Sequence, residues 1–175
     1  MSGELFHYFV EGDCEKAFIN AFVHADKGEY RFFPGKVEVF NVVFQKISPV
    51  KAMTIKRGTK IVFVYDTDVK STDIFESNID ILEKYAGINP GNIIFVPSVR
   101  KFEDEIARAC PGIKNINELL GTKGTEDFKK KFINHKDIVS KLLSVGFDMV
   151  KMWAQTPDGL FGEYGNKSKH IKDKL

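Results

Sequence analysis

The sequence feature that most constrains the fold is an unbroken apolar run at residues 61–65, Ile-Val-Phe-Val-Tyr. All five side chains are β-branched or aromatic, and these residue types favour a strand. Because apolar residues do not alternate with polar ones, the strand offers no face to water. Strands of this kind occupy the middle of a parallel sheet that is covered by helices on both faces. The run therefore predicts an α/β fold.

Strand-like and helix-like segments alternate along the rest of the first hundred residues. Further strand-like runs occupy residues 5–10, 37–44 and 92–96, and apolar residues at helical spacing occupy residues 14–25, 49–57 and 72–86. Such an alternation predicts a four-stranded, mainly parallel sheet that is flanked by helices.

The second half of the chain is expected to be helical at first and irregular later. Helical spacing recurs at residues 102–110, 115–120, 125–133 and 136–145, and residues 147–152 fit a short fifth strand. From residue 156 the chain is rich in Gly and Lys, which is typical of loops and chain ends. We therefore expect an α/β core at residues 1–100, a helical extension packed on it at 101–155, and a loop with a basic tail at 156–175.

Composition restricts the class of protein. The 175 residues are 43% hydrophobic and 29% charged, which suits a soluble globular protein. The net charge of +2 gives no strong attraction to nucleic acid, so such binding would need a local basic patch. No apolar run reaches the ~18–20 residues that span a bilayer, and the N-terminus lacks a secretory signal pattern. We expect a cytoplasmic protein with no membrane partner, in which Cys14 and Cys110 are buried free thiols.

Two of the predicted strands end in carboxylates. Glu11 directly follows residues 5–10, and Asp66 and Asp68 follow residues 61–65. Because the carboxyl ends of parallel strands lie on one edge of a sheet, all three side chains are expected there. Carboxylates at one point repel each other unless a cation lies between them. Hard oxygen ligands favour Mg²⁺ or Mn²⁺, so the pattern predicts a divalent-cation site at this edge.

Basic residues near this edge are candidates for contacts with phosphate groups. Arg100 and Lys101 follow the predicted strand at residues 92–96, and Lys16 lies in the first predicted helix. Contacts of this kind would give an affinity for nucleic acid that weakens with salt. Three consecutive lysines at residues 129–131 are instead expected on a solvated helix face.

The helix predicted at residues 102–110 carries three carboxylates. At ~100° per residue, Glu103 and Glu105 flank its apolar face. Asp104 points outward, where it can pair with Arg108.

Together these motifs resemble the Toprim domain, a metal-binding catalytic fold of bacterial primases, topoisomerases, recombination proteins and OLD-type nucleases. The family pattern is an apolar strand ending in Glu-Gly, here at Glu11, and a later one ending in Asp-x-Asp, here at Asp66 and Asp68. The sequence Val-Glu-Gly-x-x-Glu-Lys at residues 10–16 is most similar to OLD-type and small Toprim nuclease-like proteins. The resemblance covers residues 4–100 and implies a Toprim-like, Rossmann-like core.

The resemblance also implies roles for individual residues. Glu11 would act as general acid or base or would contact the metal, and Asp66 and Asp68 would ligate Mg²⁺ (or Mn²⁺). A further acidic ligand often follows the fourth strand of related nucleases in a Phe-Glu pair, and Glu103 matches that position. Glu105, or a glutamate that is simply solvated, is the alternative explanation of this position.

The function implied by the resemblance is a Mg²⁺-dependent nuclease or related phosphotransferase on DNA or RNA phosphodiesters, in phage defence or RNA processing. Magnesium held by few carboxylates keeps coordination positions open for phosphate oxygens and water. The alternative is a non-catalytic Toprim module that binds nucleic acid or a protein partner, and a homodimer is compatible with both. A flavodoxin-like or receiver-like domain is a third interpretation, but a receiver would place its acidic pair after the first strand.

Overall fold

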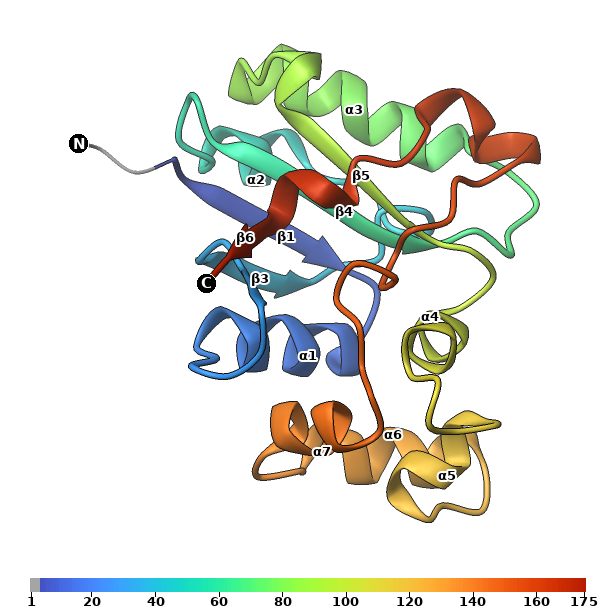
Figure 1. The fold of residues 1–175 in the computed structure, drawn as a ribbon. Helices are drawn as coiled ribbons and strands as arrows, with labels where there is room; N and C mark the ends of the chain where they lie inside the picture. The colour runs from blue at the N-terminus through green and yellow to red at the C-terminus, as the bar shows by residue number, and fades with distance from the viewer. Residues whose placement is uncertain (1–3) are drawn as a thin grey trace.

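The computed structural model describes residues 4–175 and has a four-stranded sheet at its centre (Figure 1). Its strands are β1 (Phe6–Val10), β3 (Gly35–Val39), β4 (Lys60–Asp66) and β5 (Ile93–Ser98). They lie in the order β3-β1-β4-β5, and every neighbouring pair is parallel. The predicted α/β fold, a parallel sheet flanked by helices, is therefore confirmed, and it is consistent with a Rossmann-like arrangement.

The sheet separates two hydrophobic cores because side chains alternate along each strand. On β4, Val62 lies in the core shared with α1 (Asp13–Val23). Its neighbour Phe63 lies in the core shared with α2 (Pro49–Met53) and α3 (Asp73–Ala86). β4 is thus buried on both faces, as its unbroken apolar sequence predicts.

The second half of the chain contains the predicted helices. They are α4 (Phe102–Ala109), α5 (Ile116–Leu120), α6 (Thr125–Ile133) and α7 (Ile138–Ser144). α6 and α7 pack against α1 on the side that faces away from the sheet (Figure 1). No helix within residues 4–175 has both the length and the apolar character needed to cross a membrane.

Residues 156–175, predicted as a loop and basic tail, contain regular structure instead. They form the 3₁₀ helices η2 (Gly159–Tyr164) and η3 (Ser168–Ile171) and the strand β6 (Lys172–Lys174), which pairs antiparallel with β2 (Tyr30–Phe32). The segment returns from the helical extension to lie beside β5 and then crosses toward β1 (Figure 1). Phe161 and Ile171 are buried in the two cores, one on each side of the sheet. Apolar residues are sparse and irregularly spaced in this Gly- and Lys-rich segment, so the sequence shows no helical or strand period here.

Two further strand predictions differ from the structure. β3 ends at Val39, before the predicted end at residue 44. The reason is a turn at Asn41, whose Oδ1 atom accepts hydrogen bonds from the backbone N–H groups of Val43 and Phe44. Residues 147–152, predicted as a short strand, are irregular and then form turns from residue 149 onward. The chain there leads to Trp153, which is fully buried and has a φ of 54°, in the left-handed region.

Candidate functional site

The predicted carboxylates lie at the carboxyl ends of two neighbouring strands. Glu11 directly follows β1, and Asp66 is the last residue of β4. The strand register pairs Val10 with Val64, so Glu11 falls near the end of β4. The Oε2 atom of Glu11 accepts a hydrogen bond from the backbone N–H of Asp66 at 3.1 Å. The structure therefore joins two residues that are 55 positions apart in the sequence.

The side chain of Asp66 has an unfavourable environment. Its Oδ1 atom is buried and has no hydrogen-bond partner among the described residues. Burial, and after it the negative charges of nearby carboxylates, raise the pKa of Asp66 to about 9; these carboxylates are Glu11, Glu15, Asp68 and Glu103. An unpartnered buried acceptor costs free energy, and so does a group of like charges. Either a proton or a cation at this place would relieve both costs.

Glu15 belongs to the same group, although the sequence patterns did not single it out as a site residue. It lies in the first turn of α1, and only 6% of its surface is exposed. Burial raises the pKa of Glu15 to about 7, with smaller contributions from Glu11 and Glu103. Gly12 leaves room for this side chain, since a Cβ atom there would lie 3.2 Å from Oε2 of Glu15. Its spacing of four residues from Glu11 is the signal that could have identified it.

A lysine of α6 borders the carboxylates. The Nζ atom of Lys129 lies 3.6 Å from Oε1 of Glu103. Burial acts to lower the pKa of Lys129, but nearby negative groups, Glu103 foremost, hold this pKa above its ordinary value. Lys129 is exposed, as expected for a run of lysines, yet it neutralises part of the acidic group. The sequence could not show which lysine of the run faces Glu103, because that depends on how α6 packs.

The Asp-x-Asp loop is attached to β5 through its middle residue. The N–H of Thr67 donates to the carbonyl oxygen of Ser98 at 3.1 Å, and Oγ1 of Thr67 accepts from the N–H of Arg100 at 3.0 Å. Arg100 has a φ of 75°, which residues other than Gly rarely adopt. Asp68 lies beyond the end of β4 and is exposed. The backbone of Arg100 is thus next to the predicted site.

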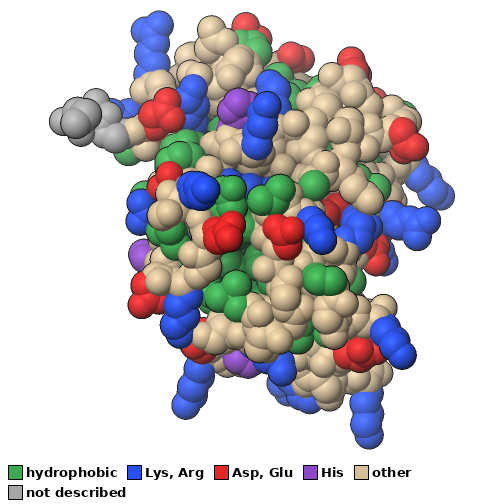
Figure 2. Space-filling model, in the orientation of Figure 1, with side chains coloured by type: hydrophobic (Ala, Val, Ile, Leu, Met, Phe, Trp, Pro, Cys, Tyr) green, Lys and Arg blue, Asp and Glu red, His purple; other side chains and the backbone are tan. Residues whose placement is uncertain are grey.

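The three candidate phosphate contacts keep their charges free. Lys16, Arg100 and Lys101 are exposed. None of the ion pairs found within residues 4–175 joins them to an acidic side chain. On the face of the molecule drawn in Figure 2, basic and acidic side chains are interspersed, and no large patch of one sign covers it. On this face any contact with phosphate would therefore be local, in line with the small net charge of +2.

Glu105, the alternative for the fourth acidic position, has a structural role instead. It is fully buried, and its carboxylate accepts hydrogen bonds from the N–H of Val99 at 2.8 Å and from the N–H of Trp153 at 3.2 Å. Arg108 pairs with Glu105 as well. The predicted pair between Arg108 and Asp104 is therefore wrong, because the buried carboxylate attracts the guanidinium group inward.

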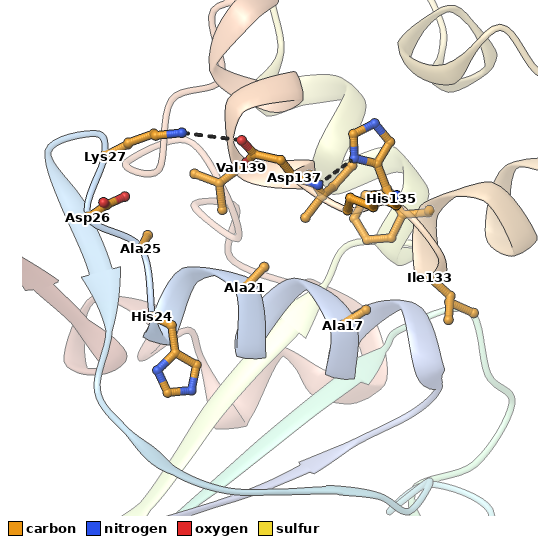
Figure 3. A pocket seen from close by; sticks show the side chains of 13 residues that line it. Ala17, Ala21, His24, Ala25, Asp26, Lys27, Ile133, His135, Asp137 and Val139 are labelled. Carbon is orange, nitrogen blue, oxygen red and sulfur yellow. Dashed lines mark hydrogen bonds and ion pairs between the residues drawn. The ribbon is translucent and has the colours of Figure 1, made fainter.

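A cavity of about 350 Å³ lies away from these residues, between the end of α1 and the connection from α6 to α7 (Figure 3). Ala17 and Ala21 of α1 line it. At its edge, Nζ of Lys27 pairs with Oδ2 of Asp137 at 3.3 Å. None of the predicted site residues lines this cavity, so it is not part of the candidate site.

The carboxylates fit a hard divalent cation in their chemistry, but they do not form a complete cage. Within residues 4–175, no three His, Cys, Asp or Glu side chains are placed to hold one ion. The unpartnered Oδ1 of Asp66 and the carboxylates around it are nevertheless the oxygen ligands that Mg²⁺ prefers. Because Mg²⁺ usually keeps several waters and takes few protein ligands, a complete cage is not required.

Comparisons with other proteins add no family to these observations. No family model, no curated protein and no solved structure matched the chain. The resemblance to the Toprim domain therefore rests on the motifs at Glu11, Asp66 and Asp68 and stays a prediction.

We expect the cation-free protein to become less stable as the pH rises from about 4 to about 9. Asp66 and Glu15 have raised pKa values, about 9 and about 7, in the folded chain. The folded state then binds protons more tightly than the unfolded state, so the free energy of unfolding falls through this window. Urea unfolding in EDTA should give a lower midpoint at about pH 8 than at about pH 5. The double variant Glu15→Gln/Asp66→Asn should show a smaller difference, and an equal difference would contradict the explanation.

Proposed function

We propose that the protein is a Mg²⁺- or Mn²⁺-dependent nuclease, or a related phosphotransferase, that acts on DNA or RNA phosphodiesters. The observation that carries this proposal is the contact between Glu11 and Asp66 at the carboxyl ends of β1 and β4, where Oδ1 of Asp66 has no hydrogen-bond partner among the described residues. Ligands of parallel α/β sheets usually bind at this edge. The resemblance to the Toprim domain rests on the same residues and supports the same chemistry.

Asp66, Asp68 and Glu103 would hold the cation, and Glu11 would be a further contact. When bound there, Mg²⁺ would polarise a phosphodiester and lower the pKa of a water molecule. Thr67 keeps the Asp-x-Asp loop against β5 through its bonds to Ser98 and Arg100, so the two aspartates stay at the sheet edge.

Proton transfer would be the task of the two glutamates at the start of α1. Burial raises the pKa of Glu11 above its ordinary value, and the pKa of Glu15 is about 7. A general acid or base is most effective when its pKa lies near the working pH, so both groups are suited to hold and release a proton. Lys129, beside Glu103, supplies a positive charge for a phosphate group. Lys16, Arg100 and Lys101 would contact the nucleic-acid backbone around the site.

A cleavage assay tests this proposal. Purified protein is incubated with single-stranded, duplex and structured DNA and RNA in the presence of Mg²⁺, Mn²⁺ or EDTA. We expect cleavage only with a cation, and a rate on the order of 100-fold lower for Asp68→Asn. Asp80→Asn is the matched control, because Asp80 is an exposed carboxylate on α3. The proposal fails if the wild type cuts no substrate or if Asp68→Asn cuts as fast as Asp80→Asn.

Non-catalytic binding of nucleic acid or a protein partner is the second candidate function, and one observation favours it. Within residues 4–175 the carboxylates form no ready-made metal cage. A module that only binds would retain nucleic acid in EDTA and cleave none. Its affinity would fall with salt and with neutralisation of Lys16, Arg100 and Lys101, because phosphate contacts release counterions. A binding titration in EDTA over a salt series distinguishes the two functions.

A further inference from the structure

The two outer strands of the sheet differ in how they are covered. Beside β5, the backbone N–H of Lys167 donates to the carbonyl oxygen of Phe95 at 2.8 Å, and η3 packs along the strand. β3 is the other outer strand, and among the described residues it pairs with β1 alone. No other backbone or side-chain partner of the β3 amides is found within residues 4–175. β3 is therefore an open edge, which can pair with another chain.

The direction of the free amide groups follows from one hydrogen bond. Just beyond β3, the N–H of Phe40 donates to the carbonyl oxygen of Val10 on β1 at 2.8 Å. Successive residues of a strand turn their N–H and C=O groups to opposite sides. The backbone groups of Gly35, Val37 and Val39 therefore point away from β1. Gly35 and Val39 are exposed, so these groups are accessible to a partner strand.

We propose that β3 pairs antiparallel with β3 of a second copy of this chain, about a two-fold axis at Val37. The sequence Gly-Lys-Val-Glu-Val at residues 35–39 is self-complementary in this register. Val37 lies opposite the partner's Val37, and Gly35 lies opposite the partner's Val39. All the outward N–H and C=O groups of β3 then meet a matching group, as in an ordinary antiparallel ladder.

The charges of Lys36 and Glu38 favour this register over the neighbouring registers of the two strands. The antiparallel pairing centred on Val37 places Lys36 opposite the partner's Glu38 on both sides of the axis. A shift by two residues in one direction would place Lys36 opposite the partner's Lys36, and a shift in the other would place Glu38 opposite the partner's Glu38. Opposite charges across a ladder stabilise it and like charges destabilise it. A shift by one residue would place residues whose N–H and C=O groups point away from β1 opposite residues whose groups point toward their own β1. The hydrogen bonds between the two copies would then be lost.

The side chains of β3 also fit a second copy. Val39 is 41% exposed, and in this register it lies over Gly35 of the opposite strand, which has no side chain. Glu38 already has two polar partners at its Oε2 atom, which lies 3.2 Å from Nζ of Lys36 and 3.1 Å from Nε2 of His7. Its pKa is lowered to about 2: burial opposes this, but hydrogen bonds from Lys51, Lys36 and His7 outweigh it. Glu38 is therefore ionised and can accept a lysine across the axis.

Disulfide trapping tests the register, and it is independent of any nuclease activity. In the proposed dimer the Val37→Cys variant brings its new thiol next to the same residue of the partner, with Cα atoms ~5.5 Å apart, which suits a disulfide. Val39→Cys is the matched control, because residue 39 lies opposite residue 35. We expect oxidation to give a cross-linked dimer with Val37→Cys and little with Val39→Cys. The endogenous Cys14 and Cys110 are buried and should not react.

Sedimentation of the reduced proteins tests the association itself. Wild type should approach twice the mass of one chain as its concentration rises. Lys36→Glu places like charges across the axis at two positions and should weaken dimerisation about tenfold. A wild type that stays monomeric throughout would overturn the proposal, and so would equal cross-linking of the two cysteine variants.

Discussion

The Asp66→Asn variant is expected to be more stable than the wild type when no cation is present, and to lose the response to Mg²⁺ and Mn²⁺. Burial and the surrounding carboxylates raise the pKa of Asp66 from 3.8 to about 9. Near neutral pH the unfolded side chain is ionised, so folding must either add a proton or bury a charge, and both cost free energy. Asn has nearly the same shape and no charge, so the variant avoids this cost.

The expected gain is on the order of 2 kcal/mol in the free energy of unfolding, or about 4–8 °C in Tm for a chain of this length. Thermal unfolding at neutral pH, in EDTA and with Mn²⁺, measures both effects. Mn²⁺ should raise the Tm of the wild type, because an ion that binds only the folded state stabilises it. The variant should show the same Tm in both conditions.

Asp68→Asn is the matched control for this prediction. Asp68 is exposed, so its neutralisation should change the free energy of unfolding in EDTA by less than about 0.5 kcal/mol. It should still weaken the stabilisation by Mn²⁺ if both aspartates hold the ion. An Asp66→Asn variant that is less stable than wild type in EDTA would show that burial of the charge is not the dominant effect. A variant that keeps its full Mn²⁺ response would place the ion elsewhere.

The sheet and the position of Glu11 and Asp66 at one edge of it were predictable, because each strand is evident from a short run of consecutive residues. The burial of β4 is evident from five apolar side chains in a row. Once the strands are parallel, their carboxyl ends share one edge of the sheet, and the order β3-β1-β4-β5 then makes β1 and β4 neighbours. The helices of the second half were predictable for the same reason, since their apolar residues recur within each helix.

The rest of the site could not be predicted because it depends on contacts between distant segments. Lys129 reaches Glu103 only because α6 packs beside α1 in a particular orientation, with Phe132 of α6 against Phe102 of α4. β2 and β6 have three residues each, which is too short for an alternating pattern to be recognised. Glu15 lies four residues after Glu11, but its burial and its effect on the pKa of Asp66 depend on how α1 packs against the sheet.

The second large effect is expected for Glu105→Ala, which should destabilise the protein by about 3–5 kcal/mol. The substitution leaves the N–H groups of Val99 and Trp153 without their acceptor. It also leaves Arg108 without its carboxylate partner. A buried donor that loses its partner costs far more than a solvated one, because water cannot replace the acceptor. Urea unfolding should show a clearly lower midpoint for Glu105→Ala than for the wild type. Glu105→Gln retains one acceptor oxygen, so its midpoint should lie between those of Glu105→Ala and the wild type.

Glu103→Ala separates the structural carboxylate from the one assigned to the site. Glu103 pairs with Lys129 at 3.6 Å near the surface, so its loss should cost less than about 1 kcal/mol in stability while weakening the Mn²⁺ response. Glu105→Ala should weaken that response as well, but indirectly, because Val99 precedes Arg100, whose N–H reaches Thr67. If Glu103→Ala destabilises the protein as much as Glu105→Ala, then Glu103 is a structural residue. The cation site would in that case be reduced to the carboxylates at the ends of β1 and β4.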